Sequence, residues 1–215
     1  MDKQDSWSGI TLFILFVLPI SLYFLFRNNT TPQYNSVPYA YSIQENGDSL
    51  YHRLPNFSFT DQEGRVFDKD RMLGNIYILS FMSLQDTLKT KILNANLKRI
   101  YDNIEEGANI RLVSIHTDSS SLASVARDLA IEADKWAFVH GPRAEVFKLG
   151  AEAFRMPEFV GKSLDTKPFT PQSIALIDKE GRIRKYYPGT DLGQVRIITD
   201  DLRTLIVMEY PEELQ

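Results

Sequence analysis

The stretch IYILSFMSLQDTLKTKILNANLKRIYDNI, residues 76–104, decides the fold. Its first residues, IYILSF, form a short apolar run of β-branched and aromatic side chains, which is typical of a fully buried strand. The spacing then changes to three to five residues, which indicates a helix whose apolar face holds Leu84, Leu88, Leu93, Leu97, Ile100, Tyr101 and Ile104. A buried strand that runs directly into a helix places a site at the strand's carboxyl end in open α/β sheets.

The turn between this strand and this helix reads MSLQDTL, residues 82–88, and it lacks a good nucleophile. The chain has no cysteine at all, which excludes disulfides, thiol redox chemistry and thiolate metal sites. A net charge of −4 without a basic run argues against nucleic acid as a partner. The 215 residues leave room for one domain of ordinary size besides a membrane segment.

Residues 9–26, GITLFILFVLPISLYFLF, carry no charge and are long enough to span a bilayer. We expect a transmembrane anchor there, after a short tail at 1–8. A cleaved signal peptide is the alternative, but the leader places Lys3 between Asp2 and Asp5, and no A-x-A site follows. Residues 27–49 are polar and aperiodic, which predicts a tether, and the folded domain is expected over 50–210.

Strands and helices alternate along the rest of the domain. Alternating residues and a turn predict a hairpin near 57–67, and a second hairpin is predicted over 173–187. Buried strands are expected at 110–115 and 136–139, with helices at 119–133, at 143–154 and from 194 onward. This order predicts an α/β fold with a central mixed sheet and helices on both faces.

Several segments stand in an order and spacing that resemble the Sco/SenC family, the membrane-anchored, copper-handling proteins of cytochrome c oxidase assembly. They are YHRLPNFSFTDQEG (51–64), IYILSFMS (76–83), LKRIYDNI (97–104), LVSIHTD (112–118) and IALIDKEGRIRKYYPGTD (174–191). The resemblance covers about residues 50–207 and the N-terminal anchor, and it rests on the joint order, since no segment alone is specific. It implies a thioredoxin-like fold with an N-terminal hairpin extension.

The family's copper site is degenerate in this sequence. A C-P-x-x-C-P turn follows the first central strand in the family, and its two cysteine positions fall on Leu84 and Leu88 here. The family's histidine position falls on Thr170. With all three ligands replaced, the resemblance implies a pseudo-active site, so we expect no enzyme activity and no cofactor. We also expect Leu88 to lie in the core and Leu84 to be partly exposed.

A substitute metal or partner pocket is the competing interpretation of the same region. Met82, His116 and Pro171 follow or precede strands whose ends should converge on one edge of the sheet, and Met156 could join them. Methionine and histidine can bind copper without cysteine. The simpler interpretation makes Met82 a core residue and His116 a loop residue, and it makes His140 a turn residue.

Three functions remain open. The first is a redox-inactive accessory protein whose partner is a respiratory oxidase subunit or a cysteine-bearing Sco-like protein. The second is metal binding through Met82 and His116, and the third is a structural, membrane-tethered domain in another envelope process. The flanking charges leave the orientation undecided, whereas the resemblance implies a single-pass membrane protein with its C-terminal domain outside the cytoplasm, on the periplasmic side.

Overall fold

The computed structural model describes residues 15, 17, 20–21, 37–40, 42–45, 48–51, 54–82, 88–105, 107–116, 122–156, 159 and 173–211. The chain divides into two compact units, Met1–Asn35 and Ser36–Gln215. Within the described ranges, no helix combines the length and the apolar character needed to cross a membrane. The anchor predicted over 9–26 falls outside these ranges except for four helical residues, so it stays a prediction.

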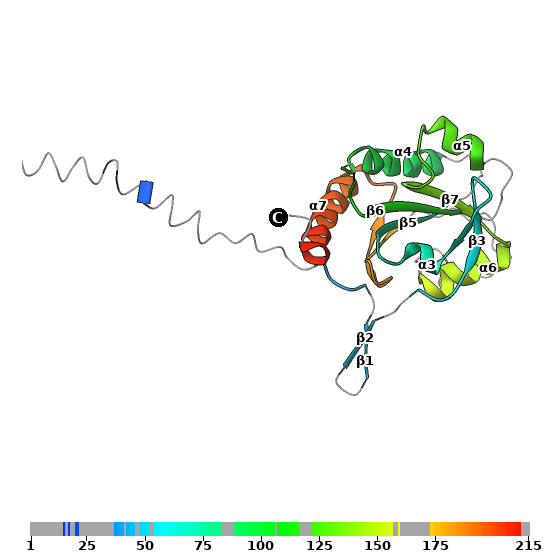
Figure 1. The fold of residues 1–215 in the computed structure, drawn as a ribbon, viewed down its shortest axis with the longest axis horizontal. Helices are drawn as coiled ribbons and strands as arrows, with labels where there is room; N and C mark the ends of the chain where they lie inside the picture. The colour runs from blue at the N-terminus through cyan, green and yellow to red at the C-terminus, as the bar shows by residue number, and fades with distance from the viewer. Residues whose placement is uncertain are drawn as a thin grey trace, which may run out of the picture. The chain divides into compact units, whose positions relative to one another are not determined.

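The second unit is built on a seven-stranded mixed sheet with the strand order β4-β3-β7-β6-β5-β8-β9 (Figure 1). The strands are β3 (Ser58–Asp61), β4 (Val66–Asp68), β5 (Ile76–Met82), β6 (Ile110–His116), β7 (Trp136–His140), β8 (Ser173–Ile177) and β9 (Ile183–Pro188). The three central strands β5, β6 and β7 are parallel, while β3 and β8 join them in antiparallel fashion. The predicted strands and both predicted hairpins are confirmed.

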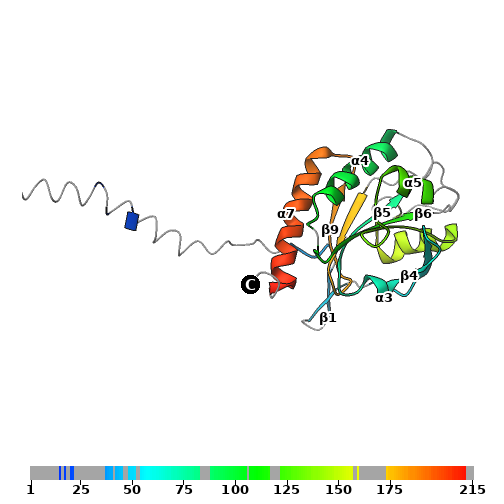
Figure 2. The same ribbon diagram turned by 45° about the horizontal axis from the view of Figure 1, so that its top comes forward.

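Helices cover both faces of this sheet (Figures 1 and 2). They are α3 (Lys69–Met72), α4 (Leu88–Asp102), α5 (Leu122–Asp128), α6 (Arg143–Lys148), the π-helix η2 (Leu149–Ala153) and α7 (Leu192–Glu209). Residues of α4, α5 and α7 pack into one apolar cluster, and residues of α3, α6 and η2 pack into the other. The mixed α/β sheet and its thioredoxin-like arrangement therefore agree with the sequence prediction.

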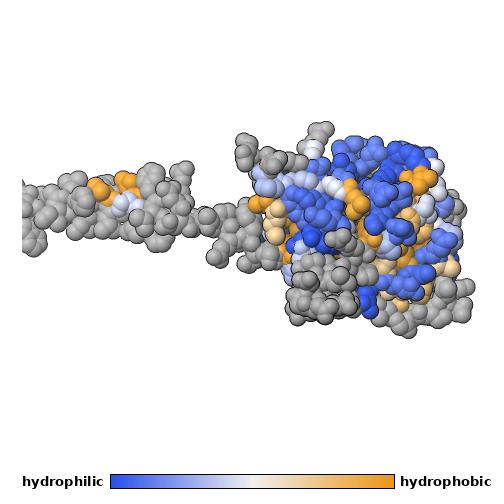
Figure 3. Space-filling model, turned by 60° about the horizontal axis from the view of Figure 1, so that its bottom comes forward, coloured by the Kyte–Doolittle hydropathy of each residue, from blue (hydrophilic) through white to orange (hydrophobic). Residues whose placement is uncertain are grey.

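The strand β5 contributes side chains to both apolar clusters, one on each face of the sheet. All its residues are buried, and they alternate between the two clusters: Ile76, Ile78 and Met82 face one, and Tyr77, Leu79 and Phe81 face the other. Each fully buried side chain of this size contributes about 1.5–3 kcal/mol. The surface is different, since Figure 3 shows a mainly hydrophilic face on which apolar residues form small separate patches.

Several polar side chains inside the domain form hydrogen bonds with one another. The hydroxyls of Ser80 and Ser114 lie 3.0 Å apart, and the indole N–H of Trp136 donates to Ser114 Oγ at 3.0 Å. At the β3–β4 turn, Asp61 accepts hydrogen bonds from Arg65 Nε and Arg71 Nη1, each at 2.9 Å. Burial opposes ionisation of Asp61, but these and backbone hydrogen bonds hold its pKa below the ordinary value.

Order begins earlier in the chain than the sequence predicted. The strands β1 (Ser42–Glu45) and β2 (Asp48–Tyr51) form a two-stranded antiparallel sheet that begins within the segment expected to be a tether, and Val37 is only 2% exposed. The dipeptide Asn46-Gly47, which stands between the two strands, is a strong hairpin signal in sequence. The polar composition of this segment concealed that signal.

Candidate functional site

Three potential metal ligands line up at the carboxyl ends of the parallel strands. Met82 ends β5 and pairs in register with His116 at the end of β6, which in turn pairs with His140 at the end of β7. The predicted convergence of Met82 and His116 is therefore confirmed. His140 ends a strand, whereas the sequence had suggested a turn residue. Its place beside His116 is given by the register of β6 and β7.

The burial of Met82 and His116 determines whether these residues can serve as metal ligands. Met82 is 3% exposed and His116 is 1% exposed, and Met82 belongs to the apolar cluster packed against α4 and α5. The His116 ring lies 5.6 Å from the ring of Phe138. Thus Met82 is a core residue, and His116 belongs to the sheet interior, where the sequence had suggested a loop. Met156 is also fully buried, but it packs in the cluster on the opposite face, so it does not join them.

Leu84 and Thr170, two of the three positions that the resemblance aligned with copper ligands, lie outside the described residues, as does Pro171. The third, Leu88, is the first residue of α4 and is 74% exposed, so the expectation that it lies in the core is wrong. The reason is helical geometry. At about 100° per residue, Leu88 lies about 140° around the helix from the buried Leu93.

The exposed side of α4 carries a short apolar surface, formed by Leu88 and Ile92, that we call the α4 stripe. Ile92 is 36% exposed, one helical turn after Leu88. The next residue on this line, Asn96, is 2% exposed and donates a hydrogen bond to the Gly189 carbonyl at 2.8 Å. The stripe therefore lies at the end of α4 nearest the carboxyl edge of β5. Lys89 and Lys91, both exposed, flank it.

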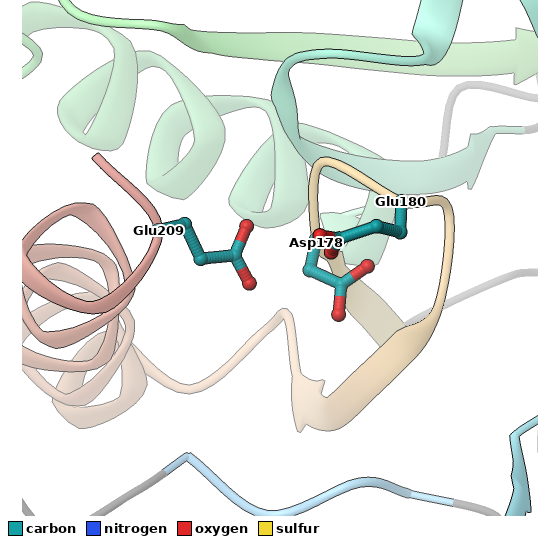
Figure 4. Close-up of side chains that lie close together, drawn as sticks. All are labelled: Asp178, Glu180 and Glu209. Carbon is teal, nitrogen blue, oxygen red and sulfur yellow. The ribbon is translucent and has the colours of Figure 1, made fainter.

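A second candidate is an acidic cluster at the opposite end of the domain. Figure 4 shows Asp178 and Glu180 close together in the β8–β9 turn, with the carboxyl group of Glu209, from the end of α7, pointing toward them. One oxygen of each lies within 4.8 Å of the others. Sequence reasoning missed this cluster because its members come from distant segments.

Cationic side chains already neutralise the acidic cluster. Arg182 Nε donates to Asp178 at 2.7 Å, and Arg182 Nη2 donates to Glu180 at 2.6 Å. Arg184, only 2% exposed, contacts both Asp178 and Glu209 at 3.3 Å. Burial raises the pKa of Glu209, which weakens it further as a metal ligand. This arrangement is an ion-pair network, and its donors occupy the oxygens that a cation would need.

The ion-pair network also fixes the N-terminal segment to the domain. Arg184 Nε and Nη2 donate to the Val37 carbonyl at 3.1 and 2.5 Å, and the Arg184 guanidinium lies 4.2 Å from the centre of the Tyr39 ring. Lys179 donates from its backbone N–H to Glu209 at 3.0 Å and from Nζ to the Glu209 carbonyl. These contacts join residues 37–39, the β8–β9 turn and the end of α7.

Several solved structures that share this fold are described as Sco or SenC proteins. A SCO1/SenC family lipoprotein from Bacillus anthracis strain Ames aligns over 73% of this chain and 96% of its own, with a TM-score of 0.62 and 22% identity. BsSco, described as a Sco-family cytochrome c oxidase assembly protein with a disulfide switch, aligns over 74% and 97%, with a TM-score of 0.60 and 20% identity.

A copper-bound ScoI from Arabidopsis thaliana aligns over 69% of this chain and 97% of its own, with a TM-score of 0.54 and 16% identity. No protein-family model and no curated protein sequence matches the chain. At these identities the likeness concerns the fold. The domain of this chain therefore has the thioredoxin-like fold of the Sco and SenC structures.

Proposed function

We propose that this chain is a cysteine-less, redox-inactive relative of the Sco/SenC proteins that binds a partner during the assembly of cytochrome c oxidase or its copper site. The shared fold supports this proposal, because the similar structures include an oxidase assembly protein and a copper-bound protein. The absence of cysteine supports the redox-inactive part, since thiol–disulfide exchange and thiolate–copper binding both need that side chain.

The observation that carries the proposal is the exposure of Leu88. An exposed leucine contributes little to folding, whereas a leucine that becomes covered by a partner contributes to binding. The α4 stripe places Leu88 and Ile92 together at the edge where the family's chemistry takes place. Lys89 and Lys91 beside it favour a partner segment with apolar and acidic side chains.

The proposal includes the membrane. Residues 9–26 would anchor the chain in a single pass and keep the domain outside the cytoplasm, beside a respiratory oxidase subunit or a cysteine-bearing Sco-like protein. The similar protein from Bacillus anthracis is described as a lipoprotein, which is also a membrane-attached arrangement. Fixing residues 37–39 to the domain would then leave only residues 27–36 as the tether.

A pull-down with the full-length tagged chain in mild detergent tests the proposal. We expect an oxidase subunit or a Sco-like protein to co-purify, and we expect the double variant Leu88→Gln, Ile92→Gln to lose it. Met208→Gln, at an exposed apolar position near the end of α7, is the matched control and should retain the partner. Equal recovery with both variants would refute docking on the stripe, and partners from another envelope process would favour the structural alternative.

Metal binding is the second candidate function, and the register of Met82, His116 and His140 is the observation that favours it. Titration of the full-length chain with Cu(I) against a competing chelator separates the two. We expect weaker binding than in a cysteine-containing relative, because a thioether and an imidazole lack the charge of a thiolate. One tightly held equivalent that is lost in the Met82→Ala, His116→Ala variant would replace the proposal with a copper-binding function.

A further inference from the structure

A pocket of about 400 Å³ lies between the start of β3 and the helical segment α6–η2. Phe57 and Phe59 form one wall, and Leu149 and Ala153 contribute to the other. Figure 1 shows α6 beside β3, on the face of the sheet opposite α4. The volume and the mainly apolar lining match those of small-molecule sites in proteins.

The shape of the pocket depends on a close contact with Phe59. A Cβ atom on Gly141 would lie 2.3 Å from Cδ1 of the Phe59 ring, so a glycine is needed for the turn after β7 to pack there. Thr60 pairs with His140, the last residue of β7. Phe59 therefore lies just beyond the carboxyl ends of the parallel strands, where open α/β sheets bind ligands.

The opposite wall is a π-helical turn. Leu149 and Ala153 are the first and last residues of η2, and the Phe154 N–H donates to the Leu149 carbonyl at 2.9 Å. Such single π turns occur frequently at functional sites. The helix does not continue regularly here, and the two apolar residues at its irregular turn face the aromatic wall of the pocket.

Two features of this pocket attract a cation. Glu145 and Glu152 line it with only Lys148 as a counter-charge, and all three are exposed. Within the described part of the chain, none of the three forms an ion pair, which leaves a net charge of −1 at the mouth. The rings of Phe57 and Phe59, with centroids 5.6 Å apart, add an aromatic surface, and aromatic faces attract cations.

We propose that this pocket binds a small organic cation, a substituted ammonium ion with an aromatic or aliphatic body. The apolar body would lie against Leu149 and Ala153, and the positive charge would lie near the ring of Phe57 and the carboxylates of Glu145 and Glu152. The site is separate from the α4 stripe, because its residues pack on the other face of the sheet. Its test is therefore independent of partner binding.

Ligand-observed NMR titration of the full-length chain in a non-ionic detergent, with phenyltrimethylammonium as the probe, tests the proposal. We expect saturable binding of this cation and at least about tenfold weaker binding of 3-phenylpropionate, which has a similar body and the opposite charge. The variant Glu145→Gln, Glu152→Gln should weaken cation binding by about threefold to tenfold. Asp128→Asn, which removes an exposed carboxylate from α5, should leave it unchanged.

Phe57→Leu separates an aromatic role from simple burial. It keeps an apolar side chain at a half-buried position, and we expect cation binding to weaken by about twofold to fivefold. Lys148→Gln should tighten binding, because it removes the opposing charge. Equal affinity for the two probes, no saturable binding, or unchanged affinity in the Glu145→Gln, Glu152→Gln variant would overturn the proposal. A loss of binding in Asp128→Asn would also overturn it, since the effect would then come from overall charge.

Discussion

Leu88→Ala and Leu93→Ala form a matched pair of substitutions within one helix, and they test the placement of α4. Leu93 is 1% exposed and Leu88 is 74% exposed. Because full burial of a leucine is worth about 1.5–3 kcal/mol, the covered quarter of Leu88 is worth about 0.4–0.8 kcal/mol. The higher helix propensity of alanine returns a few tenths of that. We therefore expect Leu88→Ala to change the free energy of unfolding by about 0.5 kcal/mol or less.

Leu93→Ala leaves a cavity in the core, so its expected cost is about 2–5 kcal/mol. Urea unfolding of the full-length variants measures both costs, with the fluorescence of the fully buried Trp136 as the signal of the domain. With a denaturant slope of about 2 kcal/mol/M, the midpoint should fall by about 1–2.5 M for Leu93→Ala and by about 0.3 M or less for Leu88→Ala. The slope itself should stay unchanged in both variants.

A loss above about 1.5 kcal/mol for Leu88→Ala would refute the reasoning, because it would mean that protein covers this side chain. The α4 stripe would then not exist as a docking surface, and Leu88 would be a core residue. A small loss for Leu88→Ala together with a loss of the co-purified partner supports docking. Measurements of stability and of partner binding thus distinguish Leu88 as a core residue from Leu88 as a docking residue.

Two further predictions concern buried charges. Asp61→Asn should lower the free energy of unfolding by about 1.5–3 kcal/mol near pH 7. The folded protein lowers the pKa of Asp61, so this stabilisation is present above the ordinary pKa of 3.8. It is lost as the pH falls through the lower pKa of the folded state. Urea midpoints of both proteins should therefore converge in acid, whereas a constant gap from pH 7 to pH 3 would contradict this role. Arg184→Gln should lower the free energy of unfolding by about 3–5 kcal/mol, because it leaves Glu209 buried without its guanidinium partner. Arg203→Gln removes an exposed ion pair and should lower it little in the same thermal or urea unfolding experiment. Equal losses in these two arginine variants would show that the network contributes no more than surface charges do.

The sequence predicted the sheet well because its strands are locally encoded. The run from Ile76 to Phe81 is buried on both faces, so its continuous apolar pattern identified the central strand directly. The β3–β4 and β8–β9 hairpins also carry their turn signals within a few residues. The hairpin at 42–51 was missed because its polar composition outweighed one Asn-Gly signal, although the dipeptide itself was visible.

The candidate sites were harder to predict because they depend on contacts between distant residues. Arg184 reaches Val37 across 147 positions of the chain, and a single sequence carries no sign of that contact. The pairing of His140 with His116 likewise follows from strand register. For Leu88, the apolar spacing suggested one long helical face, but a spacing of five residues to Leu93 rotates it away from the core. The apolar pattern thus predicted a core position for Leu88, and the helix geometry places this residue on the surface.

The exposure of Leu88 changes how a leucine at this position is interpreted, since the resemblance aligned it with a copper-binding cysteine. If the turn before α4 served only as structure, burial of the Leu88 side chain would be the physical reason for an apolar residue at this position. Leu88 is 74% exposed, so most of that reason is absent. A single exposed leucine is ordinary on a protein surface, so a docking role also requires Ile92 beside it and the two lysines that flank the pair. A polar residue at position 88 would serve folding nearly as well as leucine and would serve solubility better. Gain of solubility without loss of function in the Leu88→Gln, Ile92→Gln variant would therefore exclude a docking role for this edge, and loss of oxidase assembly with unchanged stability would establish one.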